Sequence, residues 1–252
     1  MNILIICAGD RSNYKIGLNS IKTVIQSKPK NLTVCVLDNN REIIHFLKKR
    51  KIKYVSKKIQ PFFKKIKKNE YDWLLNIWGF KILKKDFLYK FKNNLNIHPS
   101  YLPFNRGRDP YYFSVLQRSV IGATIHKMDH TIDGGKYFVR KKIKLNFPYT
   151  AGEVFDKSLK LSREIFIKNW KSIKKNKLKL KKFPEKINII NKRATLIKNN
   201  FIDLDKKDKK YEKSFVLNCL AQDFDFLKIQ IKLFKKIYNC KIILEKSLKK
   251  KW

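Results

Sequence analysis

Asn96, His98 and Asp133 are the residues of this sequence whose side chains suggest a reaction at a carbonyl carbon. Asn96 and His98 alternate in the segment LNIH, so in a strand both side chains would lie on the same face. Asp133 lies in the segment TIDGG, where the glycines permit a sharp turn. An amide and a protonated imidazole can stabilise a developing oxyanion, while a carboxylate can orient the imidazole or accept a proton. Together these side chains predict acyl transfer to an amine.

Each of these residues also has a purely structural interpretation. A histidine in a strand often makes only structural hydrogen bonds, and Asp-Gly-Gly often forms only a turn. Of the other histidines, His126 in an apolar segment could support the site, His130 lies in a turn, and His45 on an amphipathic helical segment is predicted to be structural. The order of Asn96, His98 and Asp133 along the chain is more specific than any one of them alone.

Apolar runs alternate with helical segments over the first hundred residues. Strands are predicted at 2–7, 32–38, 54–55, 72–79 and 95–98, and helices at 14–26, 41–50, 60–69 and 84–92. Strands that are apolar throughout and separated by helices favour a doubly wound α/β fold, with a mostly parallel sheet between helices. Ligands of such sheets bind outside the carboxyl ends of the strands. The polar turns at 9–13, 79–81 and 98–107 are therefore predicted to line one crevice.

The remaining residues are predicted to complete this domain and to add a small appendage. Strands at 122–128 and 136–145 flank the turn DHTIDGG, and Thr150 with Glu153 matches a capping box that begins a long helix. Phe183-Pro184 indicates a boundary, so we expect a main domain over 1–182 and a small mixed α+β appendage over 183–252. In the appendage a hairpin is predicted at 186–198, a charged linker at 203–213, a helix at 213–222, and strands at 229–234 and 240–245.

Composition narrows the class of protein. Hydrophobic residues make up 43% of the chain, enough to bury a sizeable core. We find neither a signal peptide nor an apolar run long enough to span a membrane, which predicts a soluble, cytoplasmic protein. The four cysteines lack the spacing of a metal site or a disulfide framework, so no metal is predicted. The formal charge of +40 is spread along the chain, so nucleic-acid binding is not the favoured interpretation.

Two motifs resemble the formyltransferase family that uses 10-formyltetrahydrofolate. NIHPSYLP is similar to the family pattern N-x-H-x-S-x-L-P, and GATIHKMDHTIDGG is similar to G-x-T-x-H-x-x-x-x-x-x-D-x-G. The family includes glycinamide ribonucleotide, methionyl-tRNA and sugar N-formyltransferases, and the resemblance spans roughly residues 1–180. It implies a Rossmann-like formyltransferase fold in which 1–182 is the catalytic domain, and it places the family's catalytic residues at Asn96, His98 and Asp133.

The resemblance also implies where the cosubstrate 10-formyltetrahydrofolate binds. The segment GFKIL is similar to a G-F-x-x-I-L turn whose backbone binds the pterin ring in the family. The expected folate-binding residues are Trp78, Gly79, Phe80, Lys81 and Ile82, together with Met128 and Asp129 in the loop that would form the opposite wall. Trp78 could equally belong to the hydrophobic core. The family resemblance implies no metal.

The segment SYLPFNRGRDPYYFSVL indicates the substrate within the family. It resembles the S-x-L-P-x-N-R-G pattern of sugar nucleotide formyltransferases, whereas the R-W-R-G-A-A-P pattern typical of methionyl-tRNA enzymes is absent. The turn GDRSNY is similar to, but differs from, the G-x-G-S-N phosphate loop of glycinamide ribonucleotide enzymes. The resemblance therefore implies formylation of an amino-deoxy sugar attached to a nucleoside diphosphate. The expected substrate-binding residues are Asp10, Arg11, Ser12, Arg106 and Tyr111.

Several features have alternative interpretations. Arg106 and Arg108 could bind a diphosphate or be solvent-exposed loop residues, and Tyr111 could stack on a nucleobase or pack in a helix. Methionyl-tRNA formylation and a non-catalytic nucleotide-binding module of the same fold are the competing functions. Appendages of related sugar enzymes contribute to dimerisation, so the resemblance implies a homodimer. The sequence does not indicate which nucleotide the sugar is attached to, nor which amine is formylated.

Overall fold

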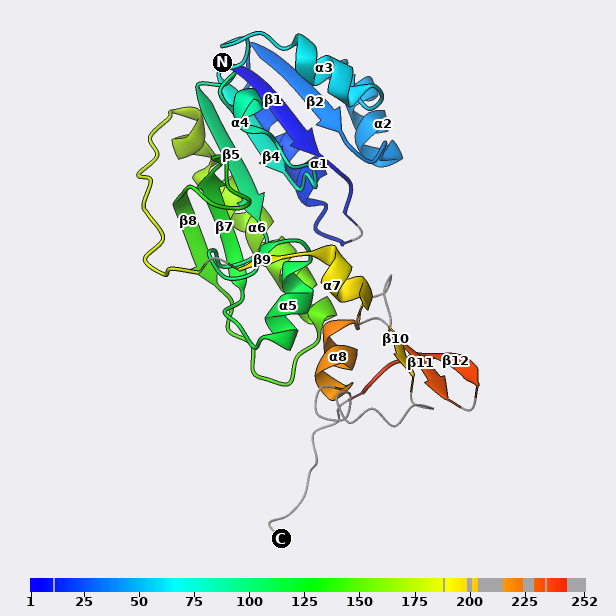
Figure 1. Cartoon of the computed structure of the whole chain (residues 1–252). Coiled ribbons are helices and arrows are strands. Elements are labelled where there is room, and N and C mark those ends of the chain that lie inside the picture. Colours follow the sequence, from blue (N-terminus) through cyan, green and yellow to red (C-terminus); the bar gives the residue numbers. More distant parts are fainter. Residues whose placement is uncertain are drawn as a thin grey trace.

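A seven-stranded sheet forms the centre of the fold, with the strand order β3-β2-β1-β4-β5-β7-β8 (Figure 1). The computed structural model describes residues 1–10, 12–187, 189–198, 201–203, 215–223, 229–233 and 235–243. β1 to β5 pair in parallel, whereas β7 pairs antiparallel with both β5 and β8. The doubly wound, mostly parallel α/β fold is thus confirmed. The strands of this sheet are β1 (Asn2–Cys7), β2 (Asn31–Val36), β3 (Lys53–Val55), β4 (Trp73–Ile77), β5 (Asn93–His98), β7 (Gly122–Lys127) and β8 (Lys136–Lys142).

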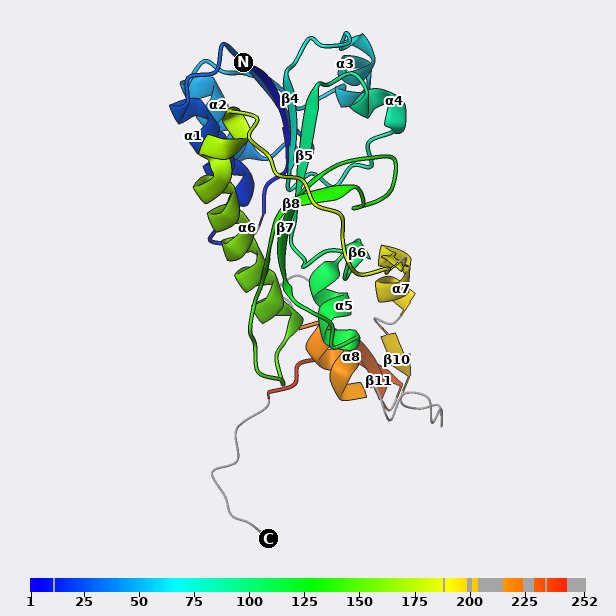
Figure 2. The same ribbon diagram turned by 90° about the vertical axis from the view of Figure 1, so that its left-hand side faces the viewer.

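Helices cover both faces of the sheet (Figure 2). One face is covered by α1 (Ile16–Gln26), α2 (Arg41–Lys49) and α6 (Ala151–Lys174), and the other by α3 (Ile59–Lys65) and α4 (Lys85–Leu88). Successive side chains of a strand point to opposite faces. In β1, Ile3 and Ile5 therefore pack with the first layer, while Leu4 and Ile6 pack with Phe63 in the second. Because both of its faces are buried, β1 is apolar from Ile3 to Cys7.

The long helix α6 begins at the predicted capping box. Thr150 Oγ1 accepts a hydrogen bond from the Glu153 amide at 3.2 Å, and Glu153 Oε2 accepts one from the Thr150 amide at 2.8 Å. These contacts satisfy amide groups that have no partner inside the helix. The apolar side of α6 packs on the sheet through Ile165, Phe166 and Trp170. In the described part of the chain, no helix combines the length and the apolar composition needed to cross a membrane.

Some boundaries differ from the sequence-based expectation. The helix expected at 84–92 is only Lys85–Leu88, because the chain must leave it to begin β5 at Asn93, where it pairs with Trp73 of β4. The strand expected at 136–145 ends at Lys142. The helix expected at 60–69 ends at Lys65. Local periodicity identified these elements, and the tertiary pairing set their ends.

The hairpin predicted at 186–198 does not form among the residues that the structure describes. Instead β9 (Ile190–Asn191) pairs in parallel with β6 (Arg106–Gly107), and the helix α7 (Arg193–Lys198) follows it. The prediction was wrong because the strand partner of β9 lies far earlier in the chain, where a local sequence pattern cannot reveal it. This pairing brings residues after Phe183 to the carboxyl end of the central sheet (Figure 1).

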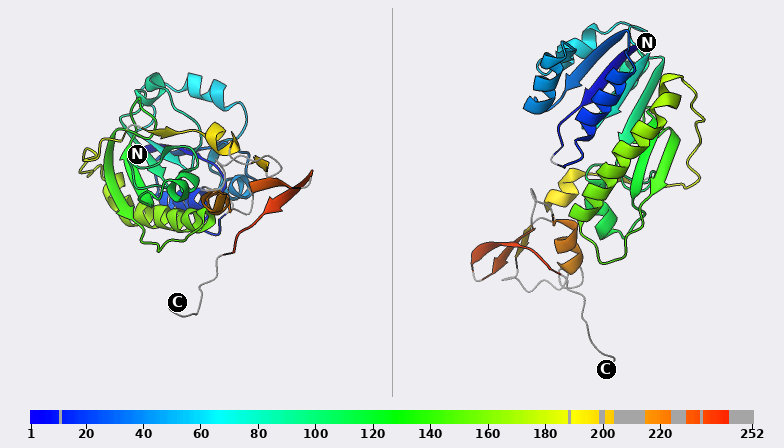
Figure 3. Two further views of the ribbon diagram at one scale, coloured as in Figure 1. Left: turned by 60° about the horizontal axis from the view of Figure 1, so that its bottom comes forward. Right: turned by 180° about the vertical axis from the view of Figure 1, so that it is seen from behind.

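A small mixed sheet lies beyond the central domain (Figure 3). It has the order β10-β11-β12, and the predicted helix at 213–222 is observed as α8, which packs on α5 through Leu220 and Ala221. The strand expected at 240–245 is wrong, since the chain forms an antiparallel pair with β11 at residues 236–240 instead. Most of the predicted linker at 203–213 lies outside the described residues. These elements are α5 (Pro110–Leu116), β10 (Phe201–Asp203), α8 (Phe215–Ala221), β11 (Ile229–Leu233) and β12 (Lys236–Cys240).

Candidate active site

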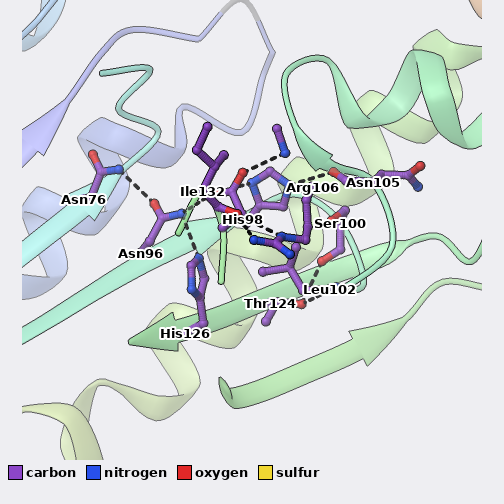
Figure 4. A network of polar contacts seen from close by, with 12 residues as sticks. Asn76, Asn96, His98, Ser100, Leu102, Asn105, Arg106, Thr124, His126 and Ile132 are labelled. Atoms are coloured by element: carbon purple, nitrogen blue, oxygen red, sulfur yellow. Dashed lines mark hydrogen bonds and ion pairs between the residues drawn. The ribbon is translucent and has the colours of Figure 1, made fainter. Parts of the chain in front are cut away.

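Asn96 lies at the centre of a polar network that crosses three adjacent strands (Figure 4). The register pairs it with Asn76 of β4 on one side and with His126 of β7 on the other. Its Oδ1 accepts a hydrogen bond from Asn76 Nδ2 at 2.9 Å. Its Nδ2 contacts His126 Nε2 at 2.9 Å and donates to Asp133 Oδ1 at 3.3 Å. These contacts define which way the Asn96 amide points.

His126 is the hydrogen-bond acceptor in this network. Its Nδ1 lies 2.8 Å from the carbonyl oxygen of Gly134, which can only accept, so Nδ1 bears the proton and Nε2 accepts from Asn96. Burial lowers the pKa of His126, although the nearby Asp133 carboxylate opposes the shift. A neutral imidazole therefore fits this position. The sequence indicated only a supporting role for His126, and the structure identifies the contact.

His98 lies beside Asp133 at the end of β5. Its Nε2 donates to the carbonyl oxygen of Asn105 at 3.2 Å, which leaves Nδ1 facing Asp133 Oδ1 at 3.6 Å. The two side chains are only 8% and 16% exposed, so the contact between them is shielded from bulk solvent. The structure thus brings together Asn96, His98 and Asp133, the three residues that sequence reasoning selected.

The Asp133 loop has an unusual backbone conformation. Asp133 has a φ angle of 47°, in the left-handed region that costs energy for a residue with a side chain. The Gly107 amide donates to Asp133 Oδ2 at 2.9 Å. The Arg106 guanidinium donates from Nε and Nη2 to the Ile132 carbonyl oxygen, at 2.9 and 2.6 Å. Oδ2 of Asp133 is therefore engaged, and Oδ1 faces Asn96 and His98.

A cavity of about 600 Å³ opens in front of these residues. Asn96, His98 and Asp133 line it together with every residue expected to bind folate, namely Trp78, Gly79, Phe80, Lys81, Ile82, Met128 and Asp129. Position 79 has no room for a side chain, since a Cβ there would lie 2.0 Å from Asn76 Oδ1. Trp78 also packs edge-on against Phe155 at 5.9 Å, so it belongs to both cavity and core. Among the residues that the structure describes, no cluster of three or more potential metal ligands occurs.

The residues expected to bind the acceptor are dispersed. Tyr111 lines the cavity, and its hydroxyl donates to Asp109 Oδ1 at 3.1 Å. Arg106 is engaged with Ile132, as described above, and its side chain does not line the cavity. Asp10 and Ser12 hydrogen-bond to each other and do not line the cavity either. Arg11 lies outside the described residues.

Several residues that line this cavity were not predicted from the sequence. Asn76 was a polar residue inside an apolar strand, which is a usable signal for a buried functional group. The segment 190–193, which was expected to lie in the appendage, also lines the cavity. Its Arg193 pairs with Asp109 at 3.1 Å. No local pattern could have placed this segment at the site.

The fold and the position of the site define a doubly wound α/β protein with its polar site at the carboxyl ends of the strands. Residues 4–169 match the sequence family described as formyl transferase, so the chain belongs to that family. This match confirms the resemblance that the two motifs indicated. It covers about two thirds of the chain, including Asn96, His98 and Asp133.

Curated relatives of this family match part of the chain. A dTDP-4-amino-4,6-dideoxyglucose formyltransferase of Mycobacterium bovis is 28% identical over 80 residues, or 32% of this chain and 34% of that protein. A methionyl-tRNA formyltransferase of Halothermothrix orenii is 30% identical over 99 residues, or 39% of this chain and 31% of that protein. The chain thus matches about a third of the length of these curated relatives.

Solved structures match over a greater length. A 4-N formyltransferase from Francisella tularensis has a TM-score of 0.80 and 22% identity, covering 98% of this chain and 99% of that one. An N-formyltransferase from Helicobacter canadensis, in complex with folinic acid and dTDP-3-aminofucose, has a TM-score of 0.74 and 19% identity, covering 93% and 85%. At these identities the likeness shows a shared fold, and it includes the region after residue 183.

Proposed function

We propose that this chain transfers a formyl group from 10-formyltetrahydrofolate to the amine of a nucleotide-linked amino-deoxy sugar. The observation that best supports this function is the convergence of Asn96, His98 and Asp133 at one end of a single large cavity. The acceptor class is supported by the sugar-nucleotide motif in the loop after β5. It is also supported by a curated relative named as a dTDP-sugar formyltransferase.

The cavity fits a folate cosubstrate. Its wall over 78–82 combines exposed apolar side chains, Phe80 at 53% and Ile82 at 72% exposure, with backbone that can hydrogen-bond a flat heterocycle. The buried Oδ1 of Asn76 has no hydrogen-bond partner among the described residues. In the Helicobacter canadensis enzyme the bound molecules are folinic acid and dTDP-3-aminofucose. When bound here, the folate would supply the formyl carbon.

The polar network suggests a role for each catalytic side chain. Asn96 Nδ2 and His98 face the place where negative charge would develop on the formyl oxygen. The 3.3 Å contact of Asn96 Nδ2 with Asp133 is longer than its 2.9 Å contact with His126, so an incoming oxygen would replace the former. Oδ1 of Asp133 is the oxygen that can accept the proton from the amine, because Oδ2 is bound to the Gly107 amide.

The acceptor would occupy the side of the cavity formed by α5 and β9. Tyr111, Lys192 and Arg193 lie there, and a guanidinium group matches the oxygens of a diphosphate. We keep Asp10, Arg11 and Ser12 as proposed contacts for the distal part of the nucleotide. This arrangement would place the sugar amine next to Asp133.

A thermal-shift screen followed by a transfer assay tests the proposal. Nucleoside diphosphates and amino-sugar nucleotides are screened with a folate analogue present, and a stabilising ligand identifies the base and the sugar. Formyl transfer to that sugar is then followed by mass spectrometry. We expect Asn96→Ala, His98→Ala and Asp133→Asn each to slow transfer by about a hundredfold or more while the fold is retained. Near-normal turnover in all three variants would refute the function.

Methionyl-tRNA formylation is the second candidate, because a curated relative of that name matches and the chain has a formal charge of +40. The two functions differ in their response to salt. Binding of tRNA releases counterions and weakens steeply as the salt concentration rises, whereas a diphosphate makes far fewer contacts. Tight, salt-sensitive binding of initiator tRNA with no response to sugar nucleotides would favour this candidate instead.

The small sheet provides a surface for the proposed homodimer. Among the described residues β12 is the last strand of this sheet, and it exposes Ile237 and Tyr238, at 61% and 47%. Pairing of two β12 strands would extend the sheet across the two copies. Analytical ultracentrifugation at micromolar concentration should show a dimer, and Ile237→Lys should shift the population toward monomer. A wild-type protein that sediments as a monomer would count against it.

A further inference from the structure

Two consecutive residues of β6 hold the catalytic carboxylate. Arg106 donates from Nε and Nη2 to the Ile132 carbonyl oxygen, at 2.9 and 2.6 Å (Figure 4). These hydrogen bonds hold the peptide group between Ile132 and Asp133. Gly107 donates its amide to Asp133 Oδ2 at 2.9 Å. Asp133 itself has the left-handed φ of 47°, which needs support from its surroundings. β6 therefore holds both the backbone and the side chain of this residue.

The Arg106 side chain is directed at the loop and away from the substrate cavity. Both of its donors go to one carbonyl oxygen, and the side chain is absent from the cavity lining. The guanidinium passes close to Gly134, where a Cβ would lie 3.3 Å from Arg106 Nη2 and 1.8 Å from Thr131 Oγ1.

β6 is in turn held by the segment after residue 183. Gly107 pairs with Asn191 of β9, and the Arg108 amide donates to the Asn191 carbonyl oxygen at 3.0 Å. The contact is close: Gly107 has a φ of +96°, and a Cβ there would lie 2.3 Å from that oxygen. A chain of direct contacts therefore leads from β9 through β6 to Asp133.

We propose that Arg106 is a positioning residue for Asp133, and that the β6–β9 pair is the scaffold on which it acts. Arg106 sets the Ile132–Asp133 peptide, and Gly107, aligned by Asn191, sets the carboxylate oxygen. The segment 190–193 is then part of the catalytic unit. The meaning of this role for catalysis rests on the proposed formyl transfer, but the structural role can be measured without substrate.

Amide hydrogen exchange at Gly107 tests the structural role in the unliganded protein. Arg106→Met removes the hydrogen bonds to the Ile132 carbonyl oxygen. The Gly107 amide should then exchange at least about tenfold faster, while the exchange rates of the β1 and β4 amides stay unchanged. Lys90→Met is the matched control, because Lys90 also holds a backbone carbonyl, that of Ile66 at 2.7 Å, in a part of the fold distant in the chain from β6, β9 and the Asp133 loop. Unchanged Gly107 exchange in Arg106→Met would overturn the proposal, whatever reaction the protein catalyses.

Steady-state kinetics with the identified acceptor separates positioning from substrate binding. A positioning role predicts that kcat of Arg106→Met falls about 10- to 100-fold while the acceptor KM stays within about twofold. Arg106→Lys retains one donor for the Ile132 carbonyl oxygen, so its kcat should lie between those of Arg106→Met and the wild type. If Arg106→Met does not fold, Arg106→Lys alone is compared with the wild type. A rise in acceptor KM with normal kcat would identify a substrate contact and overturn the proposal. Absence of formyl transfer in the wild type would refute the proposed function only, since the exchange result stands independently.

Discussion

The buried His126 should make the stability of the protein depend on pH in a defined window. Burial lowers the pKa of native His126 below that of a histidine in the unfolded chain, which is about 6.5. Below pH 6.5 the unfolded chain therefore binds a proton that the native state does not, and the free energy of unfolding falls as the pH falls. For one group the loss between pH 6.5 and 5.5 is up to RT ln(11/2), or about 1 kcal/mol.

The perturbation that isolates this contribution is His126→Gln, which removes the titrating group from the site. Urea unfolding of both proteins at pH 5.5, 6.5 and 7.5 gives the difference in the free energy of unfolding. We expect that difference to be largest at pH 7.5 and to shrink by up to about 1 kcal/mol from pH 6.5 to 5.5. The variant lacks the His126 contribution to this slope, so its own free energy of unfolding should change less between pH 6.5 and 5.5.

Ile125→Val is the control for this experiment. Ile125 is the fully buried neighbour of His126 in β7, and the substitution costs about 0.5–1.5 kcal/mol without removing a titrating group. Its stability should run parallel to the wild type at every pH. A His126→Gln curve that also runs parallel would refute the reasoning, because it would mean that native His126 takes up a proton as readily as the unfolded chain.

Three further substitutions test other contacts. Gly107→Ala should lower Tm and slow formyl transfer, because the new Cβ would clash with Asn191 at 2.3 Å in a left-handed conformation; calorimetry and the transfer assay check both. Asn76→Leu removes the donor to Asn96 Oδ1 and should lower kcat about tenfold or more, measured by steady-state kinetics. Thr150→Ala removes the cap of α6 and should cost about 1 kcal/mol in urea unfolding with activity unchanged.

Much of the fold was predictable because its determinants are local. The continuous apolar runs of β1 and β4 require burial on both faces, and the alternation of runs with helical periodicity predicts a doubly wound sheet. The capping box of Thr150 was readable for the same reason, since both partners lie within one helical turn. Element ends were less predictable, because pairing with another strand decides where β5 begins.

Some residues of the site could likewise be placed from the local sequence, and others only from the tertiary structure. Asn96 and His98 share a face because they are two residues apart in one strand, so the sequence alone determined that they lie together. His126 and Asn76 join them only through the register of β4, β5 and β7. That register depends on contacts between segments distant in the chain.

The sequence by itself determined the α/β class, the three catalytic candidates and the family motifs, because each depends on residue type and short spacing. Only the tertiary structure decided how Asp133 is held. The pairing of β6 with β9 joins residues 106–107 to 190–191, and neither two-residue strand carries a recognisable signal of its own. Arg106 illustrates the difference: its type suggested a phosphate ligand, whereas its position in the fold directs it to the Ile132 carbonyl oxygen.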